Sequence, residues 1–271
     1  MMKQETPKKT FKKNPIPGTK FTIAISSAKG GVGKSTFATN IALALKKIGC
    51  SVGLLDADIY GPSLPKLFSI NNKPESDGKT LIPIMKYDIQ CMSMGFLTDE
   101  QTPMIWRGPM VTSAIKTFTQ KVAWKNLDFI IVDMPPGTGD VSISLSQFLS
   151  LSETLIITTP QKTASDVAQR AGIMANKVKS DVIGVIENMS FIEIGGEKLL
   201  PFGEGGGRSL ADSLDTKFFG SIPLDPEIGK LADAGELIKS KNSSVYSAFV
   251  EIAETIINTK PNKIPLNISI N

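Results

Sequence analysis

The residues best suited to chemistry lie in one glycine-rich segment near the start of the chain, with the sequence AKGGVGKST. Glycines let consecutive backbone N–H groups turn toward one anion, and the start of a following helix adds its partial positive charge. The Lys34 ammonium can neutralise the β- and γ-phosphates of a nucleotide, and the Ser35 hydroxyl can coordinate Mg²⁺. The segment follows the P-loop pattern GxxxxGK[ST] except at its first position, where Ala28 replaces glycine. The residues predicted to bind nucleotide phosphates are Ala28, Lys29, Gly30, Gly31, Val32, Gly33, Lys34, Ser35 and Thr36.

Carboxylates follow two apolar runs farther along the chain. Asp133 ends the run Ile130-Ile131-Val132, and a carboxylate at the end of a buried strand can reach the water shell of Mg²⁺. Asp56 and Asp58 follow Leu54-Leu55, where one carboxylate can face the metal water and the other the γ-phosphate. Asp56 and Asp58 could alternatively be solvated carboxylates at a strand end, or one of them could cap a turn.

Apolar runs alternate with helical patterns along most of the chain and would position these polar residues. Continuous apolar strands that alternate with helices are typical of a parallel sheet covered on both faces. We therefore predict an α/β fold, a single P-loop domain with a mostly parallel sheet of about 7–8 strands and helices on both faces. The predicted strands are Phe21–Ser27, Ser51–Asp58, Leu127–Met134, Thr154–Thr159, Val182–Glu187 and Phe218–Ile222, and the predicted helices are Lys34–Ile48, Met110–Val122, Thr163–Val178 and Ser243–Asn258.

Local composition suggests where the domain begins and ends. Residues 1–18 form a basic tail that ends in NPIPG, residues 19–260 form the domain, and residues 261–271 form an extension. Residues 62–108 are rich in Pro, Asn and Gly, and we expect them to leave the core, with a possible hairpin at Leu81–Phe96.

Composition excludes several classes of function. The sequence contains no histidine, which excludes His-based triads and His-ligated zinc. Residues 1–20 hold six of the 30 Lys and Arg and one of the 26 acidic residues, so the remainder has 24 basic against 25 acidic residues. This balance argues against a nucleic-acid-binding face on the domain. The two cysteines, Cys50 and Cys91, are far apart, and no apolar run is long enough for a membrane span, so we expect a cytoplasmic protein that binds neither nucleic acid nor membrane.

Several stretches, in order over roughly residues 16–240, resemble the Mrp/ApbC ATPases, a branch of the deviant Walker A class that includes MinD and ParA. They are KGGVGKS, LLDADIYGPS, WRGP, DMPPGTGD, ENMS, FGEGGG and GSIPLDP. The resemblance implies a homodimer that binds and hydrolyses ATP with Mg²⁺ and serves as an iron–sulfur cluster carrier or assembly factor. The runner-up function is an ATP-switched interaction or positioning protein of the MinD or ParA kind.

The resemblance also implies roles for individual residues. Three residues would be catalytic. Lys29 would cross the dimer interface and stabilise charge on the partner's transferring phosphate, while Lys34 would contact the phosphates of its own subunit's nucleotide. Asp58 would orient or activate the attacking water. Asp56 would support the metal shell with Ser35 and Asp133. Asn188, which offers both a donor and an acceptor, would bind the adenine edge, although it could alternatively belong to a turn.

The family's cluster-binding CxxC is missing from this chain. It would lie between ENMS and FGEGGG, where this sequence has FIEIGGEKLLP. A [4Fe–4S] cluster expected from the family needs thiolate ligands, and we identify no residue here that would hold it. We therefore expect the protein to act on clusters through a Cys-bearing partner rather than to hold one in the family's usual place.

Overall fold

The computed structural model describes residues 16–97, 113–149 except 115 and 119, 153–233 and 244–260. Eight of the strands in these ranges form one sheet in the order β10-β7-β6-β1-β5-β2-β4-β3. Only the β3–β4 pair in this sheet is antiparallel, and all other neighbours are parallel. The strands are β1 (Thr19–Ser26), β2 (Val52–Asp56), β3 (Ile84–Lys86), β4 (Ile89–Ser93), β5 (Leu127–Asp133), β6 (Glu153–Thr158), β7 (Asp181–Glu187) and β10 (Phe218–Ser221).

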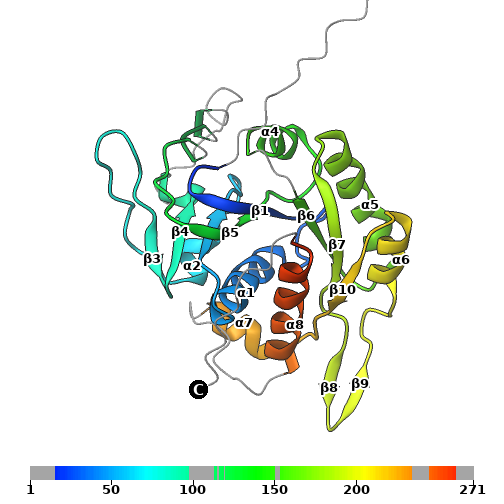
Figure 1. Ribbon diagram of the computed structural model, residues 1–271. Coiled ribbons are helices and arrows are strands. Elements are labelled where there is room, and N and C mark those ends of the chain that lie inside the picture. The colour runs from blue at the N-terminus through cyan, green and yellow to red at the C-terminus, as the bar shows by residue number, and fades with distance from the viewer. Residues whose placement is uncertain are drawn as a thin grey trace, which may run out of the picture.

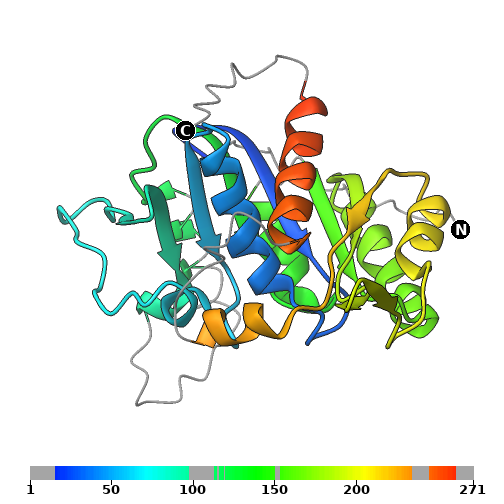
Figure 2. The same cartoon turned by 90° about the horizontal axis from the view of Figure 1, so that it is seen from below.

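Helices cover both faces of this sheet, which confirms the predicted fold class (Figure 1). Helices α1 (Lys34–Lys47) and α8 (Ser244–Asn258) lie side by side on one face (Figure 2). The others are α2 (Leu64–Leu67), α4 (Asp140–Phe148), α5 (Lys162–Lys177), α6 (Gly206–Ser213) and α7 (Pro226–Asp233). No helix in the described ranges is long and apolar enough to cross a membrane.

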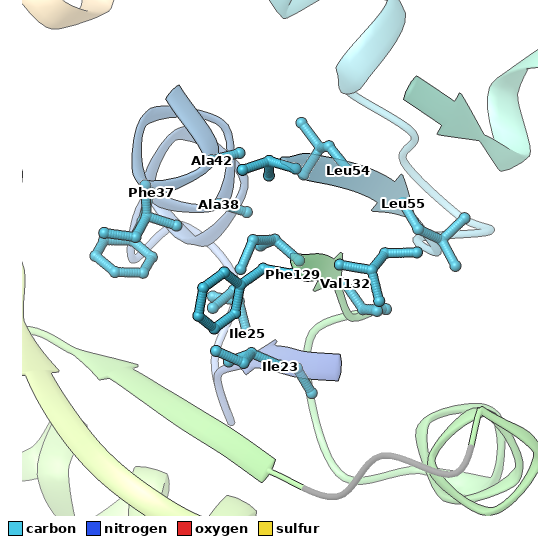
Figure 3. Packing of buried hydrophobic residues seen from close by; sticks show 14 of the residues in the cluster. Ile23, Ile25, Phe37, Ala38, Ala42, Leu54, Leu55, Phe129 and Val132 are labelled. Carbon is cyan, nitrogen blue, oxygen red and sulfur yellow. The ribbon is translucent and has the colours of Figure 1, made fainter. Parts of the chain in front are cut away.

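The core lies between α1 and the central strands. Ala38 and Ala42 of α1 are fully buried and face the sheet, where Phe129 of β5 and Ile25 of β1 pack beneath them (Figure 3). Small alanine side chains let the helix approach the sheet closely, so the helix that follows β1 is held firmly in place. This packing fixes the start of α1, which is where Lys34 lies.

Residues 84–93 of the segment 62–108 belong to the main sheet, so the prediction that the segment leaves the core is wrong for this part. The hairpin expected within Leu81–Phe96 forms, and its strand β4 pairs in parallel with β2, which extends the main sheet. Tyr87 and Asp88 occupy the two-residue turn with φ angles of 51° and 57°, the left-handed region typical of a type I′ hairpin. The sequence does not reveal this pairing because the register between β2 and β4 is a long-range property.

Some expected segments fall outside the described residues. These are residues 1–15 of the tail, the extension 261–271 and part of the helix expected at Met110–Val122, of which residues 113, 114, 116–118 and 120 are helical. Ile16, assigned to the tail, is buried in the core. Residues 190–210, for which no strand or helix was predicted, contain a two-stranded hairpin of β8 (Ile192–Ile194) and β9 (Glu197–Leu199) and the start of α6.

Candidate functional site

The glycine-rich loop connects the end of β1 to the start of α1 as predicted. Gly31 and Gly33 both have a φ of 80°, a backbone conformation that side chains with a Cβ rarely adopt. A Cβ on Gly31 would meet no atom within 4 Å, so this part of the loop borders open space. A Cβ on Gly33 would lie 2.4 Å from Nδ2 of Asn188. The loop therefore combines an open side for a ligand with a closed side against Asn188.

Lys34 and Asp133 meet at the floor of this loop. The Lys34 Nζ donates to Oδ1 of Asp133 at 2.5 Å, and both side chains are buried. Burial raises the pKa of Asp133, while the charge of Lys34 and hydrogen bonds from Lys34 and Ser35 oppose that rise. The structure thus brings together three predicted residues: the phosphate-binding lysine and the pair Ser35 and Asp133 expected to serve the metal.

Asp56 lies beside Asp133 because their strands are neighbours and the two residues are direct partners in the register. Its carboxylate accepts four hydrogen bonds. Oδ2 accepts from Ser63 N at 2.9 Å, Leu64 N at 3.0 Å and the Ser93 hydroxyl at 2.9 Å, and Oδ1 accepts from Asp58 N at 3.2 Å. Burial first, and then the charge of Asp133, raise the pKa of Asp56 to about 7. Asp56 therefore holds together the loop that carries Asp58, whatever else it does.

Asp58 follows β2 and is buried at the same edge. Its Oδ1 accepts hydrogen bonds from Tyr60 N at 3.1 Å and Gly61 N at 3.2 Å. The charge of Asp58 acts on Asp133 and raises the pKa of that carboxyl. Within the described chain both backbone donors reach Oδ1, which leaves Oδ2 to accept a hydrogen bond from a water molecule.

A cavity of about 230 Å³ opens beside the loop. It is smaller than the roughly 300–1,000 Å³ typical of sites for whole drug-sized ligands, and it suits a single nucleobase. Asn188 lies at its wall, and its Nδ2 donates to Val32 O of the loop at 2.8 Å. The remaining wall is mostly apolar and includes Phe37, Ile222, Pro223, Leu224, Ile228 and Phe249.

Three features of this cavity refine the sequence prediction. Asn188, predicted to bind a base, lies at the cavity but also holds the P-loop through Val32, so one of its two amide N–H donors is already in use. Phe249 of α8 was not predicted, because its spacing is that of an ordinary buried helix face. Met189, which follows Asn188, has a φ of 57°. This conformation is uncommon for a residue with a side chain, and functional sites often hold it.

The second glycine-rich stretch, Gly205-Gly206-Gly207, does not form another phosphate loop. Gly207 N donates to the carboxylate of Glu187 at 2.7 Å, so the start of α6 already receives a negative charge from the protein. A Cβ on Gly206 would lie 2.3 Å from Pro160 O, and one on Gly207 would lie 2.7 Å from the Glu187 Cβ. Gly206 therefore allows α6 to pack closely against the backbone after β6, and Gly207 allows it to pack against Glu187 of β7, a role that sequence spacing did not reveal.

Lys29 is exposed at the mouth of the loop, and its carbonyl oxygen accepts a hydrogen bond from the Ser27 hydroxyl at 3.0 Å.

The two cysteines lie elsewhere in the structure. Cys50 precedes β2 at the amino edge of the sheet, and Cys91 lies inside β4. Both are buried, and burial raises the pKa of Cys50 to about 11 and that of Cys91 to about 12. Neither lies near the segment where the family's CxxC was expected, which instead forms the β8–β9 hairpin.

Comparison with known proteins gives one consistent result. The ParA family, described as NUBPL iron-transfer P-loop NTPase, matches residues 18–257. The iron-sulfur cluster carrier protein of Aquifex aeolicus is 42% identical over 261 residues, 94% of this chain and 72% of that protein. The iron-sulfur cluster transfer protein NUBPL of Mus musculus is 42% identical over 253 residues, 91% of this chain and 79% of that protein.

A solved structure extends the similarity to the fold and to a nucleotide. A nucleotide-binding protein from Archaeoglobus fulgidus, in complex with ADP, is 35% identical and superposes with a TM-score of 0.74, covering 84% of this chain and 91% of that one. The family resemblance found in the sequence is thereby confirmed. The chain belongs to the ParA family of NUBPL-type iron-transfer P-loop NTPases.

Proposed function

We propose that this protein is a Mg²⁺-dependent ATPase that works as a homodimer and assists the transfer of iron–sulfur clusters held by a Cys-bearing partner. The proposal rests on one observation: an open glycine loop, a buried Lys–Asp pair and a base-sized cavity meet at the carboxyl edge of one sheet. The printed names of the relatives supply the iron–sulfur part of the proposal.

The residues at this edge suit a nucleotide with its metal. Mg²⁺ prefers hard oxygen ligands, and Asp133, Asp56 and the Ser35 hydroxyl offer them. Asp56 and Asp133 are buried register partners on neighbouring strands, and the charge of Asp133 raises the pKa of Asp56. A nearby cation would stabilise both ionised carboxylates, which supports this assignment. Ser35 would hold the metal directly, and Asp133 and Asp56 would reach it through water. When bound, Mg²⁺ neutralises the charge of the phosphates.

The protein's own groups would then direct hydrolysis. Lys34 would leave Asp133 for the β- and γ-phosphate oxygens, and the backbone N–H groups of the loop would hold the same phosphates. Asp58 would orient a water molecule through Oδ2. The oxygen of that water would attack the γ-phosphorus while the bond between the γ-phosphorus and the β-phosphate oxygen breaks. The cavity beside Asn188 would hold the adenine base.

Lys29 would act on the nucleotide of a second subunit. Its backbone starts the loop, and its side chain is exposed, whereas the buried Lys34 is placed for the subunit's own phosphates. A cation that reaches across an interface stabilises charge on the transferring phosphoryl group in the way an arginine finger does. ATP would therefore close the dimer, and hydrolysis would open it.

The residues of this chain do not fit an iron–sulfur cluster in the family's usual place. Among the described residues no group of three or more His, Cys, Asp or Glu could hold a metal ion. Cys50 and Cys91 are buried with raised pKa values, and a sulfide cluster prefers thiolate ligands. We therefore assign the thiolates to a partner protein. The missing CxxC also keeps open a second function, an ATP-switched interaction protein that handles no cluster.

Three measurements test this proposal. Phosphate release from ATP should require Mg²⁺ and stop with EDTA. Anaerobic reconstitution with ferrous iron and sulfide should leave the purified protein without stoichiometric iron, whereas ATP should change the rate at which a loaded donor passes its cluster to an apo-acceptor. About four irons per dimer, lost in Cys50→Ser or Cys91→Ser, would restore direct cluster binding. A transfer rate that ignores ATP would favour the second function.

A further inference from the structure

A hydrogen bond joins Asn188 to Val32, although 156 positions separate the two residues. The Asn188 Nδ2 donates to Val32 O at 2.8 Å. Asn188 follows β7, and Val32 lies in the glycine-rich loop that follows β1. Strand β6 lies between β7 and β1 in the sheet, so the side chain reaches the loop past the end of a third strand (Figure 1). This contact connects the wall of the base-sized cavity to the loop assigned to the phosphates.

The backbone of Asn188 is held firmly at the end of the sheet. Asn188 N donates to Thr158 O of β6 at 2.8 Å. Ser190 donates its hydroxyl to Glu187 O at 2.8 Å and its backbone N–H to Ile222 O at 2.9 Å. A polar group holds its partner more precisely when it projects from a rigid element than when it projects from a loop. The Asn188 amide therefore offers the P-loop a donor at a fixed place.

Gly33 gives the Asn188 amide the room that this contact needs. A Cβ at Gly33 would lie 2.4 Å from Nδ2 of Asn188, closer than real Cβ atoms come to another atom. The φ of 80° at Gly33 is also a conformation that glycine adopts without steric cost. The loop residue that follows Val32 is therefore glycine for two reasons, and one of them is the approach of Asn188.

The peptide between Val32 and Gly33 links this contact to phosphate binding. The C=O and the N–H of a trans peptide lie in one plane and point in opposite directions. The described chain contains no cis peptide bond. Because Val32 O points toward Asn188, the Gly33 N–H points away from Asn188. The orientation of one backbone donor of the P-loop is therefore set by a side chain from the end of β7.

Helix α1 fixes the next peptide of the chain rather than this one. Phe37 N donates to Gly33 O at 2.8 Å, so the helix holds the carbonyl that follows Gly33. Val32 O lies one peptide earlier, where Asn188 supplies the donor. Without that donor, the Val32–Gly33 peptide could rotate about its two flanking bonds, and a glycine offers little steric resistance to such a rotation.

We propose that Asn188 is a positioning residue of the P-loop, which holds Val32 O so that the Gly33 N–H faces the phosphates before a nucleotide binds. This inference rests on the proposed function and adds that Asn188 acts on the phosphates through the loop, independently of any contact with the base. A donor that is oriented in advance needs no reordering when the ligand arrives, and this strengthens binding. The base cavity and the phosphate loop thus share one amide group.

Inorganic tripolyphosphate, which has no base, tests this role. Asn188→Leu keeps the approximate size of the side chain and removes the donor to Val32 O. In calorimetry with Mg²⁺, its affinity for tripolyphosphate should fall about three- to tenfold, the range expected for one lost hydrogen bond. Its affinity for ATP should fall at least as much. Leu224→Ala is the matched control, because Leu224 lines the same cavity from the segment after β10. It should weaken ATP binding and leave tripolyphosphate binding unchanged.

A second variant and a stability measurement separate positioning from a general loss of structure. Asn188→Ala also lacks the donor and introduces no new bulk, so it should lose the same affinity for tripolyphosphate. Urea unfolding without ligand reports the stability of each variant. A purely structural role of Asn188 would lower the unfolding midpoint while the folded variants kept the wild-type affinity for tripolyphosphate, and that result would overturn the inference.

The outcomes also separate this inference from the proposed function. If both Asn188 variants bind ATP more weakly but tripolyphosphate like the wild type, Asn188 serves only the base, and the inference is wrong while the proposed ATPase stands. A wild type that binds ATP but not tripolyphosphate would likewise contradict a loop that is set for phosphates in advance. If the wild type binds neither ligand, the proposed function is wrong as well.

Discussion

The Lys34 ammonium lies 2.5 Å from Oδ1 of Asp133, although 99 positions separate the two residues. The pair forms because β1 and β5 are neighbours, with Ile25 opposite Asp133, and because α1 starts at Lys34 immediately after the loop that follows β1. Both charges are buried, so each depends on the other. An incoming phosphate offers Lys34 a second anion, and a metal ion offers Asp133 a second cation. Nucleotide binding can therefore exchange this ion pair for contacts with the ligand.

Lys34→Ala should abolish nucleotide binding, because it removes the lysine placed for the subunit's own phosphates. It should also lower the free energy of unfolding, since Asp133 loses its buried partner. Calorimetry with ATP and urea unfolding measure the two effects. Lys47→Ala, at the exposed end of the same helix, is the control. ATP binding within about threefold of the wild type, or about 0.6 kcal/mol, would show that the P-loop assignment is wrong.

Lys29→Ala should leave folding and ADP binding largely intact but abolish both ATP-dependent dimerisation and hydrolysis. The reason is that the exposed Lys29 side chain is assigned to the partner's nucleotide rather than to its own. Light scattering with and without an ATP analogue, together with phosphate release, measures the outcome. Lys79→Ala removes an exposed lysine from a distant loop and should behave like the wild type. Intact turnover and an unchanged ATP-dependent mass in Lys29→Ala would contradict the role across the interface.

Asp58→Asn should keep ATP bound while it slows hydrolysis by about a hundredfold or more, which is typical of a lost positioning or proton-accepting group. The amide oxygen can still accept the backbone bonds of Tyr60 and Gly61, so the loop should keep its shape. A long-lived closed dimer in light scattering is the expected companion result. Asp212→Asn, an exposed carboxylate of α6, is the control. Turnover at the wild-type rate would remove Asp58 from the reaction.

Asp56→Asn should flatten the pH dependence of stability in the absence of nucleotide. Burial and the charge of Asp133 raise the pKa of Asp56 from its ordinary 3.8 to about 7. Between these two values the folded protein keeps a proton that the unfolded chain releases, so this contribution to stability is present below 3.8 and lost as the pH rises to about 7. Urea unfolding with EDTA across this range measures the slope. Asp181→Asn, an exposed carboxylate, should keep the wild-type slope, and the same slope in Asp56→Asn would contradict the assignment.

Local sequence was sufficient for the P-loop and the strands around it. A strand, a glycine turn and a helix follow one another within residues 19–47, so neighbouring residues dictate their geometry. The start of α6 was missed because Gly205-Gly206-Gly207 has no helical preference. Its conformation depends on the Glu187 carboxylate and on the space beside Pro160, which belong to other elements.

The amino-acid sequence by itself determined the fold class, the family and the position of the phosphate loop, because these depend on periodicity and on motifs within short windows. Only the tertiary structure decided which residues line the cavity beside the loop and which groups the carboxylates contact. The cavity joins Phe37 of α1, Asn188 after β7 and Phe249 of α8, and Asp56 depends on Ser93 of β4. Such groupings follow from strand order and register, which arise when distant segments bury their apolar surfaces against one another.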